Sequence, residues 1–542
     1  MPDLVTESLA DQALDNLVNQ FARPLDFLRE LVQNAIDAGS PRVEVELSRH
    51  PSAAGKVVEI AVQDFGDGMD EAIIDEELTR LFASSKENDL TRIGKFGIGF
   101  TSVFAVEPEA VIVRTGRHGE AWELLFHPDR SFDKVRLDTL VRGTRVTLFK
   151  ELPHDAVDAF VRECRWILSF WCEHSNTPIQ LIDTVPEPAR ASSDDPFAAF
   201  EAPTSRPETI NRPLALEAPM SLASSEDGVE LSIGFGSLPR YGFYNGGLTL
   251  LNTTNTDVLG HYAPRLAHYA FKLKCDALEH TLTRDNVLQD EHWERAMGVL
   301  VRAAGRLELR TARSVQARLE AGDSVDLHLA LLAKAPLTQP TLRKALALPD
   351  RHGRPWPLDD VLKQARREGA ALVARGSDDL LGALEASSRR LLPTSPDIRR
   401  IVVSAQVGRA QNTADASEVW VLPRIVPDDQ LSQEERALLQ GTRALLTDVG
   451  RLHVVIGAFD TDEDALVLQG PPDGGLFRRA RRKRWFERST LLLHRAHPHL
   501  LALLAAAEQD RQLAALALAQ ALLYADGSAS DRNLTKLLEA VA

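Results

Sequence analysis

The hydrophobic residues between Pro24 and Ala38 follow the spacing of an amphipathic helix. The apolar positions that recur three and four residues apart are Leu28, Leu31, Val32, Ala35 and Ile36. Glu30, Asn34 and Asp37 stand at i, i+4 and i+7, so they share one stripe of the same helix. That stripe is polar where a core helix would be apolar, and it therefore marks candidate chemistry.

Two of these side chains suit a phosphate-bearing metal site. The neutral amide oxygen of Asn34 is a good ligand for a Mg²⁺ ion that already carries phosphate oxygens. Glu30 lies one helical turn away, where it could orient and deprotonate an attacking water. The alternative is a solvated helix face without chemistry. Taken alone, the stripe leaves both interpretations open.

A strand followed by a glycine turn comes next in the chain. The alternation in Val57–Gln63 predicts a strand that Asp64 ends. Gly66 and Gly68 permit a tight turn and a close backbone approach. A buried carboxylate at Asp64 can accept a hydrogen bond from an adenine amino group, and Met69 could pack on the base. The alternative is a plain Asp-Gly turn, which is common.

A glycine-rich stretch, Gly94–Ser102, follows about 30 residues later. Its glycines leave backbone N–H groups free to face phosphate, and a helix beginning near Thr101 would add its N-terminal dipole. The alternative is a flexible loop. Thr144, just before the predicted strand Arg145–Phe149, would add a hydroxyl near the base. All four parts in this order predict an ATP site that has no Walker motif.

With these motifs the chain resembles the GHKL ATPases, the superfamily of gyrase, heat-shock chaperones, histidine kinases and MutL. The resemblance implies that Glu30 is the general base and Asn34 the magnesium ligand. The residues that it assigns to ATP binding are Asn34, Asp37, Asp64, Gly66, Gly68, Met69, Lys86, Gly94, Lys95, Phe96, Gly97, Ile98, Gly99, Phe100 and Thr144. For Lys86, a phosphate contact and a solvated lid lysine remain equal alternatives.

Further segments resemble the ninety-kilodalton heat-shock chaperones of the HtpG class. They are Ile93–Phe104, His174–Leu181 and Leu282–Gln289. The last resembles a middle-domain segment that carries a catalytic arginine, which implies that Arg284 stabilises charge on the γ-phosphate. A surface helix-cap arginine is the alternative. The spacing leaves a supporting role for Gln289 open.

The fold class that the resemblance implies is α+β, with an N-terminal GHKL (Bergerat) α/β sandwich. We expect the ATP-binding domain in residues 1–183, a linker rich in Pro, Ser and acidic residues in 184–225, and an α/β middle domain in 226–420. Residues 421–542 would form a mostly helical C-terminal region. Its apolar seam comprises Leu500, Leu503, Leu504, Leu513, Leu516, Leu522 and Leu523. The seam predicts either a dimer interface, as the resemblance implies, or an intramolecular core.

Composition restricts the partners. The 542 residues carry 62 basic and 78 acidic side chains, a net charge of −16, which argues against nucleic acid as the main partner. A basic run at 478–484 is read as a solvated helix end, with an acidic partner or nucleic acid as alternatives.

Three cysteines without metal spacing, no apolar run of 18 residues and no signal-peptide pattern at the start predict a cytoplasmic protein without a membrane contact.

The resulting hypothesis is a slow, Mg²⁺-dependent ATPase of the HtpG type. ATP would close a lid at residues 76–100, bring Arg284 to the γ-phosphate and drive a homodimeric clamp that remodels client proteins. One alternative is a binding module in which ATP switches a specialised partner, in stress or defence. The other is a MutL-like or gyrase-like nucleic-acid ATPase.

Overall fold

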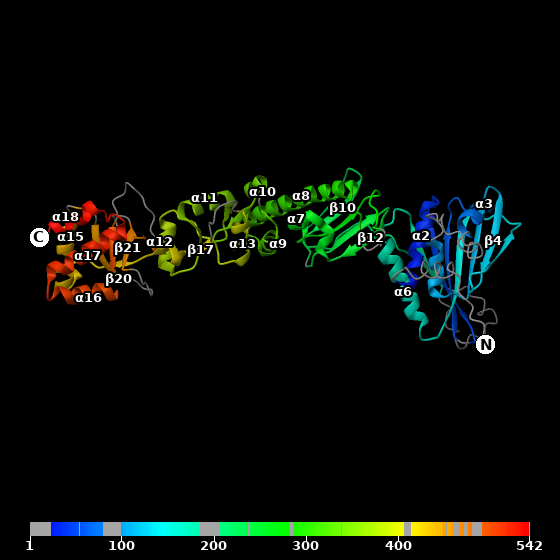
Figure 1. Ribbon diagram of the computed structural model, residues 1–542, viewed down its shortest axis with the longest axis horizontal. Helices are drawn as coiled ribbons and strands as arrows, with labels where there is room; N and C mark the ends of the chain where they lie inside the picture. The colour runs from blue at the N-terminus through cyan, green and yellow to red at the C-terminus, as the bar shows by residue number, and fades with distance from the viewer. Residues whose placement is uncertain are drawn as a thin grey trace, which may run out of the picture. The chain divides into compact units, whose positions relative to one another are not determined.

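The computed structural model divides the chain into two compact units, Met1–Leu307 and Glu308–Ala542. It describes residues 23–53, 55–79, 99–184, 205–236, 238–281, 286–337, 339–405, 413–447, 449, 453–458, 466–470, 475–479 and 490–540. The long helix α8 (Glu291–Ala321) contains the boundary between the units. Figure 1 shows the order of the elements along the chain.

The first unit begins with an eight-stranded mixed sheet in the order β5-β4-β3-β6-β2-β1-β7-β8. Its strands are β1 (Val43–Pro51), β2 (Lys56–Asp64), β3 (Ala110–Arg117), β4 (Glu120–Phe126), β5 (Phe132–Arg136), β6 (Gly143–Leu152), β7 (Ile179–Thr184) and β8 (Ser205–Thr209). Only the β1–β7 pair is parallel among these described strands. Alternate residues of β1 are fully buried, as expected of a strand with one face on a core.

Two helices pack against each other over this core, α2 (Phe27–Asp37) and α6 (Val157–Cys172). The predicted helix of residues 24–38 is confirmed as a 3₁₀ turn, η1 (Pro24–Asp26), that leads into α2. The predicted strands at residues 57–63 and 145–149 lie within β2 and β6. Short helical pieces complete the domain: α3 (Glu71–Ile73), η2 (Ile74–Leu78) and η4 (Ser102–Val106).

Part of the predicted 184–225 linker is structured instead. Residues 205–209 pair with β7 as the edge strand β8, and residues 221–225 belong to the next sheet. Pro207 is tolerated in β8 because an edge strand has one side on which no backbone N–H is needed. Composition alone suggested a linker because the pairing partner of β8, residues 179–184, lies more than 20 residues earlier in the chain.

A five-stranded sheet in the order β12-β11-β13-β10-β9 completes the first unit. Its strands are β9 (Ser221–Glu226), β10 (Val229–Gly234), β11 (Tyr241–Asn245), β12 (Leu248–Thr253) and β13 (Ala270–Lys274), with the helical pieces η6 (Thr256–Tyr262) and α7 (Ala263–Leu266). Figure 1 shows α8 alongside this sheet. Helix α6 packs on β12, where Thr249 Oγ1 donates to the Phe170 carbonyl at 2.7 Å.

The second unit combines helices with a six-stranded sheet in the order β18-β22-β21-β23-β20-β19. Its helices are α9 (Asp326–Leu332), α10 (Pro340–Ala345), α11 (Leu358–Glu368), α12 (Asp378–Ala386), α13 (Pro396–Ser404), α14 (Ala416–Val419), η7 (Asp428–Gln430), α15 (Gln433–Thr447), α16 (Pro498–Ala507), α17 (Arg511–Asp526) and α18 (Asp531–Glu539). Its strands are β14 (Ala347–Pro349), β15 (Pro355–Pro357), β16 (Ala371–Val373), β17 (Thr413–Asp415), β18 (Trp420–Val421), β19 (Arg424–Ile425), β20 (His453–Ala458), β21 (Val467–Gly470), β22 (Phe477–Arg478) and β23 (Thr490–His494). The C-terminal region is therefore less purely helical than expected, because β19–β23 lie within it.

The predicted leucine seam is divided between core and surface. Leu500, Leu522 and Leu523 are fully buried in the core of the second unit, so the intramolecular alternative accounts for them. Leu513 is 61% exposed. The dimer interface stays a prediction.

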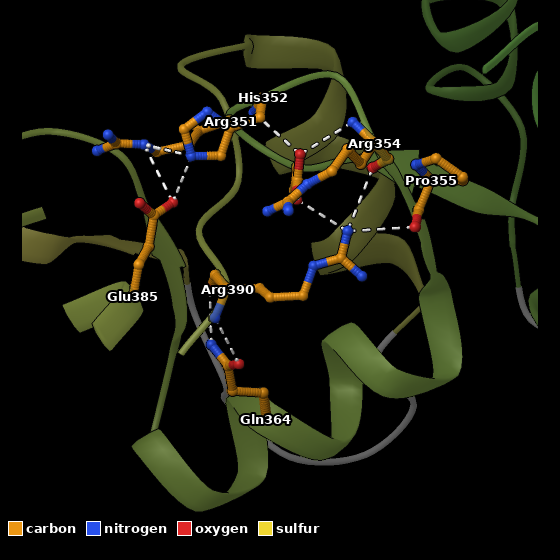
Figure 2. Close-up of polar contacts among 8 residues, drawn as sticks. Arg351, His352, Arg354, Pro355, Gln364, Glu385 and Arg390 are labelled. Atoms are coloured by element: carbon orange, nitrogen blue, oxygen red, sulfur yellow. Dashed lines mark hydrogen bonds and ion pairs between the residues drawn. The ribbon is translucent and has the colours of Figure 1, made fainter. Parts of the chain in front are cut away.

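A buried acid organises the β14–β15 hairpin of the second unit. Asp350 accepts hydrogen bonds from the Arg354 and Arg390 side chains, each at 2.9 Å, and from the backbone N–H groups of His352 and Arg354. Figure 2 shows Arg390 reaching this hairpin and also donating to the Pro355 carbonyl. Burial acts in the opposite direction, but the hydrogen bonds from Arg390 and Arg354 hold the pKa of Asp350 below its usual value.

The three cysteines, Cys164, Cys172 and Cys275, are buried free thiols. Burial raises the pKa of Cys164 and of Cys172 to about 12, so these thiols stay protonated and inert. Among the described helices, none has the length and apolar character needed to cross a membrane.

Candidate functional site

The polar stripe of α2 lies at the edge of a cavity of about 280 Å³ in the first unit. Asn34 and Asp37 line this cavity, and Gln33 Nε2 donates to Asp37 Oδ1 at 2.8 Å. Glu30 does not line it. Its side chain is nearly buried one turn earlier on α2, and its Oε1 lies 3.5 Å from Arg29 Nη1.

Asp64 enters the same cavity from the end of β2. Its Oδ1 accepts two backbone hydrogen bonds, from Gly66 at 2.9 Å and from Thr144 at 3.1 Å. Burial is the main influence on the carboxyl and raises its pKa, although the two N–H groups act in the opposite direction. No described residue hydrogen-bonds Oδ2, which leaves this oxygen for a donor in the cavity.

The turn after Asp64 requires glycines for steric reasons. Gly68 has a φ of +69°, and a Cβ on it would clash with the Gly116 carbonyl. A Cβ on Gly66 would likewise clash with the Ala38 carbonyl. The turn therefore lies close against neighbouring backbone and presents Met69 to the cavity.

Two threonines on neighbouring strands hold this turn in place through hydrogen bonds. Thr115 and Thr144 face each other between β3 and β6, and their hydroxyl oxygens lie 3.0 Å apart. Thr115 Oγ1 also accepts a hydrogen bond from the Met69 backbone at 2.8 Å. Thr115 is not recognisable from the sequence, since only the register of β3 and β6 reveals its position. Arg117 and Glu77 also line the cavity and were not predicted.

The described end of the glycine-rich stretch lies beside the cavity, and Phe100 forms part of its lining. A Cβ built on Gly99 would lie 3.0 Å from Glu30 Oε2 and 4.0 Å from Asn34 Oδ1. Gly99 thus brings backbone next to the predicted general base, Glu30, and the predicted magnesium ligand, Asn34. Phe100 is buried, lines the cavity and packs against Phe126 with ring centroids 5.4 Å apart.

Several predicted site residues lie outside the part of the chain that the structure describes. They are Lys86, Gly94, Lys95, Phe96, Gly97, Ile98 and Arg284. Gln289 is described, is exposed and lies near Gly260, where a Cβ would come within 3.3 Å of its Oε1. The roles of these residues stay predictions.

Arg29 connects α2 to the segment that follows β13. Its guanidinium lies over the Trp171 ring, 4.8 Å from the centroid, and its Nη2 lies 2.7 Å from His280 Nε2. His280 pairs with Val287 in an isolated antiparallel bridge. His280 and Val287 therefore flank the segment that contains Arg284, and Arg29 contacts this bridge through His280.

This geometry agrees with a comparison against known families. Residues 25–136 match the family described as histidine kinase-, DNA gyrase B- and HSP90-like ATPase. The N-terminal part of the chain therefore carries a GHKL-type ATPase domain. The matched residues include α2, the Asp64 turn and the Thr115 strand, and β6 with Thr144 follows them.

The curated proteins that are similar to this chain agree with a divergent GHKL member. The chaperone protein HtpG of Ehrlichia ruminantium is 30% identical over 199 residues, which are 31% of each chain. HtpG of Pseudoalteromonas translucida is 29% identical over 217 residues, 35% of this chain and 33% of the relative. The DNA mismatch repair protein MutL of Shewanella woodyi is 32% identical over 118 residues, 20% of this chain and 18% of the relative.

The chain thus spans about a third of the length of the HtpG relatives that it matches. The similarity supports the ATPase domain and leaves the activity of the whole protein to be proposed.

Proposed function

We propose that this protein binds Mg²⁺-ATP in the cavity of the GHKL domain and hydrolyses it. One observation carries the proposal: Asn34, Asp64 and Thr144, which come from three separate elements, line one cavity. Gly99 lies close to both Asn34 and Glu30. The cavity volume approaches the range of sites that enclose small molecules.

The Asp64 side of the cavity would hold the base. Oδ1 is engaged by two backbone N–H groups, so Oδ2 is the acceptor that an adenine amino group would meet. Guanine presents a carbonyl oxygen at that position, which a carboxylate repels. Met69 and Val146 supply apolar contacts on the base from the cavity wall.

The α2 side would hold the phosphates. The Asn34 amide has no hydrogen-bond partner among the described residues, and its oxygen is a suitable magnesium ligand. A bound Mg²⁺ would neutralise charge on the phosphate oxygens. Asp37, held by Gln33, is oriented toward the same cavity and can accept hydrogen bonds from water around the phosphates.

Glu30 is the candidate general base. It sits one turn from Asn34 with Oε2 beside Gly99, so a water near Gly99 would lie within its reach. Arg29 contacts the same carboxylate and would restrain its rotamer. The residues that this proposal makes catalytic are Glu30 and Arg284.

We further propose that hydrolysis drives an HtpG-type chaperone, a cytoplasmic homodimeric clamp that remodels client proteins. Support comes from the HtpG relatives and from the link between Arg29 and the bridge at His280. That link ties the GHKL domain to the segment of Arg284, which closure would bring to the γ-phosphate.

The test is ATP turnover of the wild type, Glu30→Ala and Arg284→Ala, each with its solution mass. We expect Glu30→Ala to bind ATP but to lose about a hundredfold or more in turnover, the contribution typical of a general base. Turnover lost in both variants with a persistent dimer supports the clamp. Unchanged turnover of Glu30→Ala would remove the base assignment, and loss in Glu30→Ala alone would favour an ATP-driven switch module.

A nucleic-acid ATPase is the second candidate, which the similarity to MutL favours. Duplex DNA added to the wild type would then increase turnover severalfold. The net charge of −16 argues against it.

A further inference from the structure

A second cavity, of about 600 Å³, lies in the first unit and shares no lining residue with the ATP cavity. The C-terminal part of α6 forms one side, the face of β11 and β13 forms another, and the segment after β8 forms a third. None of the site residues predicted from the sequence lies in it. Its volume falls within the range that encloses small organic ligands.

The walls of this cavity are held in place by hydrogen bonds. The Arg212 backbone N–H donates to the Glu173 carbonyl at 2.5 Å, and the Arg212 carbonyl accepts from His174 Nδ1 at 3.0 Å. Asn211 adds three hydrogen bonds, one from the Ile179 N–H to its Oδ1 and two from its Nδ2 to the Ser175 and Thr177 carbonyls. The cavity is therefore formed before any ligand arrives.

The lining of the cavity carries more basic than acidic side chains. Lys272 Nζ lies 3.1 Å from Glu173 Oε1 and 2.8 Å from His174 Nε2, so one of its three N–H groups is left over. Arg240 donates only to a neutral group, Asn252 Oδ1 at 2.6 Å, and within the described residues it has no carboxylate partner. Arg212 also lacks one there. Besides Glu173, the only acid among the described residues that line the cavity is Glu217, which lies on the same exposed segment as Arg212. The lining therefore has a net positive charge.

The opposite wall is aromatic. Trp166 and Phe170 stack with centroids 4.9 Å apart and an interplanar angle of 15°. Arg23 lies 4.5 Å from the Trp166 centroid and helps to hold the indole. Trp166 is nevertheless 44% exposed, so part of its ring is accessible from the cavity. Tyr244 and Phe271 are buried and also line the cavity.

We propose that this cavity binds a small aromatic carboxylate. Its carboxylate meets the guanidinium of Arg240 and the spare N–H of Lys272, and its ring packs against the Trp166–Phe170 wall. Arginine suits the anion because its fork matches the two oxygens of a carboxylate. Aromatic walls suit a ring because stacked and edge-to-face contacts are favourable. Since the walls come from both α6 and the second sheet, a bound ligand stabilises the contact between these two elements.

The test uses the full chain and two matched probes, 2-naphthoate and the neutral 2-naphthamide, in titration calorimetry. We expect 2-naphthoate to bind. Arg240→Gln should weaken binding about tenfold, the loss typical of a charged hydrogen bond. Trp166→Leu should weaken it about fivefold, the loss typical of an aromatic contact. Arg295→Gln is the control, because Arg295 is an exposed arginine of α8 outside the cavity. Thermal melting of each variant verifies that it folds.

The proposal is overturned if 2-naphthoate does not bind, or if the amide binds equally well. It is also overturned if both cavity variants bind like the wild type, or if saturating ATP displaces the probe. Binding that is lost in Arg240→Gln, retained in Arg295→Gln and unaffected by ATP supports it. These readouts need no ATP turnover, so they are independent of the proposed function.

Discussion

Gly99 lies against the carboxylate of Glu30. A Cβ on this glycine would come within 3.0 Å of Oε2, closer than nine in ten real Cβ contacts. No φ in the left-handed region requires glycine at this position, so the restriction is one of space beside the predicted base. Substitution of Gly99 therefore tests the geometry of Glu30 without removing any functional group.

We expect Gly99→Ala to lower ATP turnover by roughly tenfold or more, because displacing a reactive group by a fraction of an ångström weakens catalysis steeply. ATP affinity should change little, since Asp64 and Thr144 are untouched. Steady-state turnover and calorimetry measure the two effects. Gly382→Ala, where an added Cβ meets nothing within 4 Å, is the matched control. Equal turnover in both variants would contradict the placement of Glu30.

Asp64→Asn should weaken ATP binding by about a hundredfold while the domain stays folded. The amide oxygen can still accept from Gly66 and Thr144, but an NH₂ group replaces Oδ2 and opposes the adenine amino group. Calorimetric titration with ATP measures the change. Asp67→Asn removes the same charge from an exposed residue of the cavity lining and should bind ATP normally. Normal binding by Asp64→Asn would refute the base pocket.

His280→Ala should lower turnover about fivefold at unchanged ATP affinity. The variant removes one of the partners of Arg29 and loosens the bridge that flanks the Arg284 segment. A coupling contact of this kind is typically worth about 1 kcal/mol. A double-mutant cycle with Arg284→Ala checks the mechanism. Strictly additive effects of the two changes would mean that His280 does not act through Arg284.

Asp350→Asn should destabilise the second unit by about 3 kcal/mol at pH 7, because it leaves two arginines without their buried partner. Denaturant unfolding measures the difference. The exposed Asp360→Asn is the control, since its ion pair with Lys363 lies on the surface. Comparable stability of the two variants would show that the Asp350 network is dispensable.

The same network sets a pH dependence. The folded pKa of Asp350 is lowered, so its contribution to stability is complete above its ordinary value of 3.8 and is lost as the pH falls through the lower folded value. The difference between wild type and Asp350→Asn should therefore shrink below pH 3.8. A difference that stays constant between pH 7 and pH 3 would exclude this carboxylate as the cause.

Local patterns were sufficient for much of the GHKL domain. The periodicity of residues 24–38 predicted η1 and α2, and alternation predicted β2 and β6. Gly66 and Gly68 are needed because neighbouring backbone leaves no room for a Cβ at either position. This agrees with the close backbone approach that the glycine motif predicted. These features depend on neighbours in sequence, so spacing carries the information.

The sequence by itself determined which residue types meet the nucleotide and the order in which they occur. Only the tertiary structure decided the rest, because it depends on contacts between distant segments. The register of β3 and β6 places Thr115 beside Thr144, and the pairing of β7 with β8 gives structure to residues that composition assigned to a linker. The second cavity brings the end of α6 together with β11 and β13, although Cys172 at the end of α6 precedes the first residue of β11, Tyr241, by almost 70 positions. Local periodicity in the sequence does not predict contacts between segments so far apart.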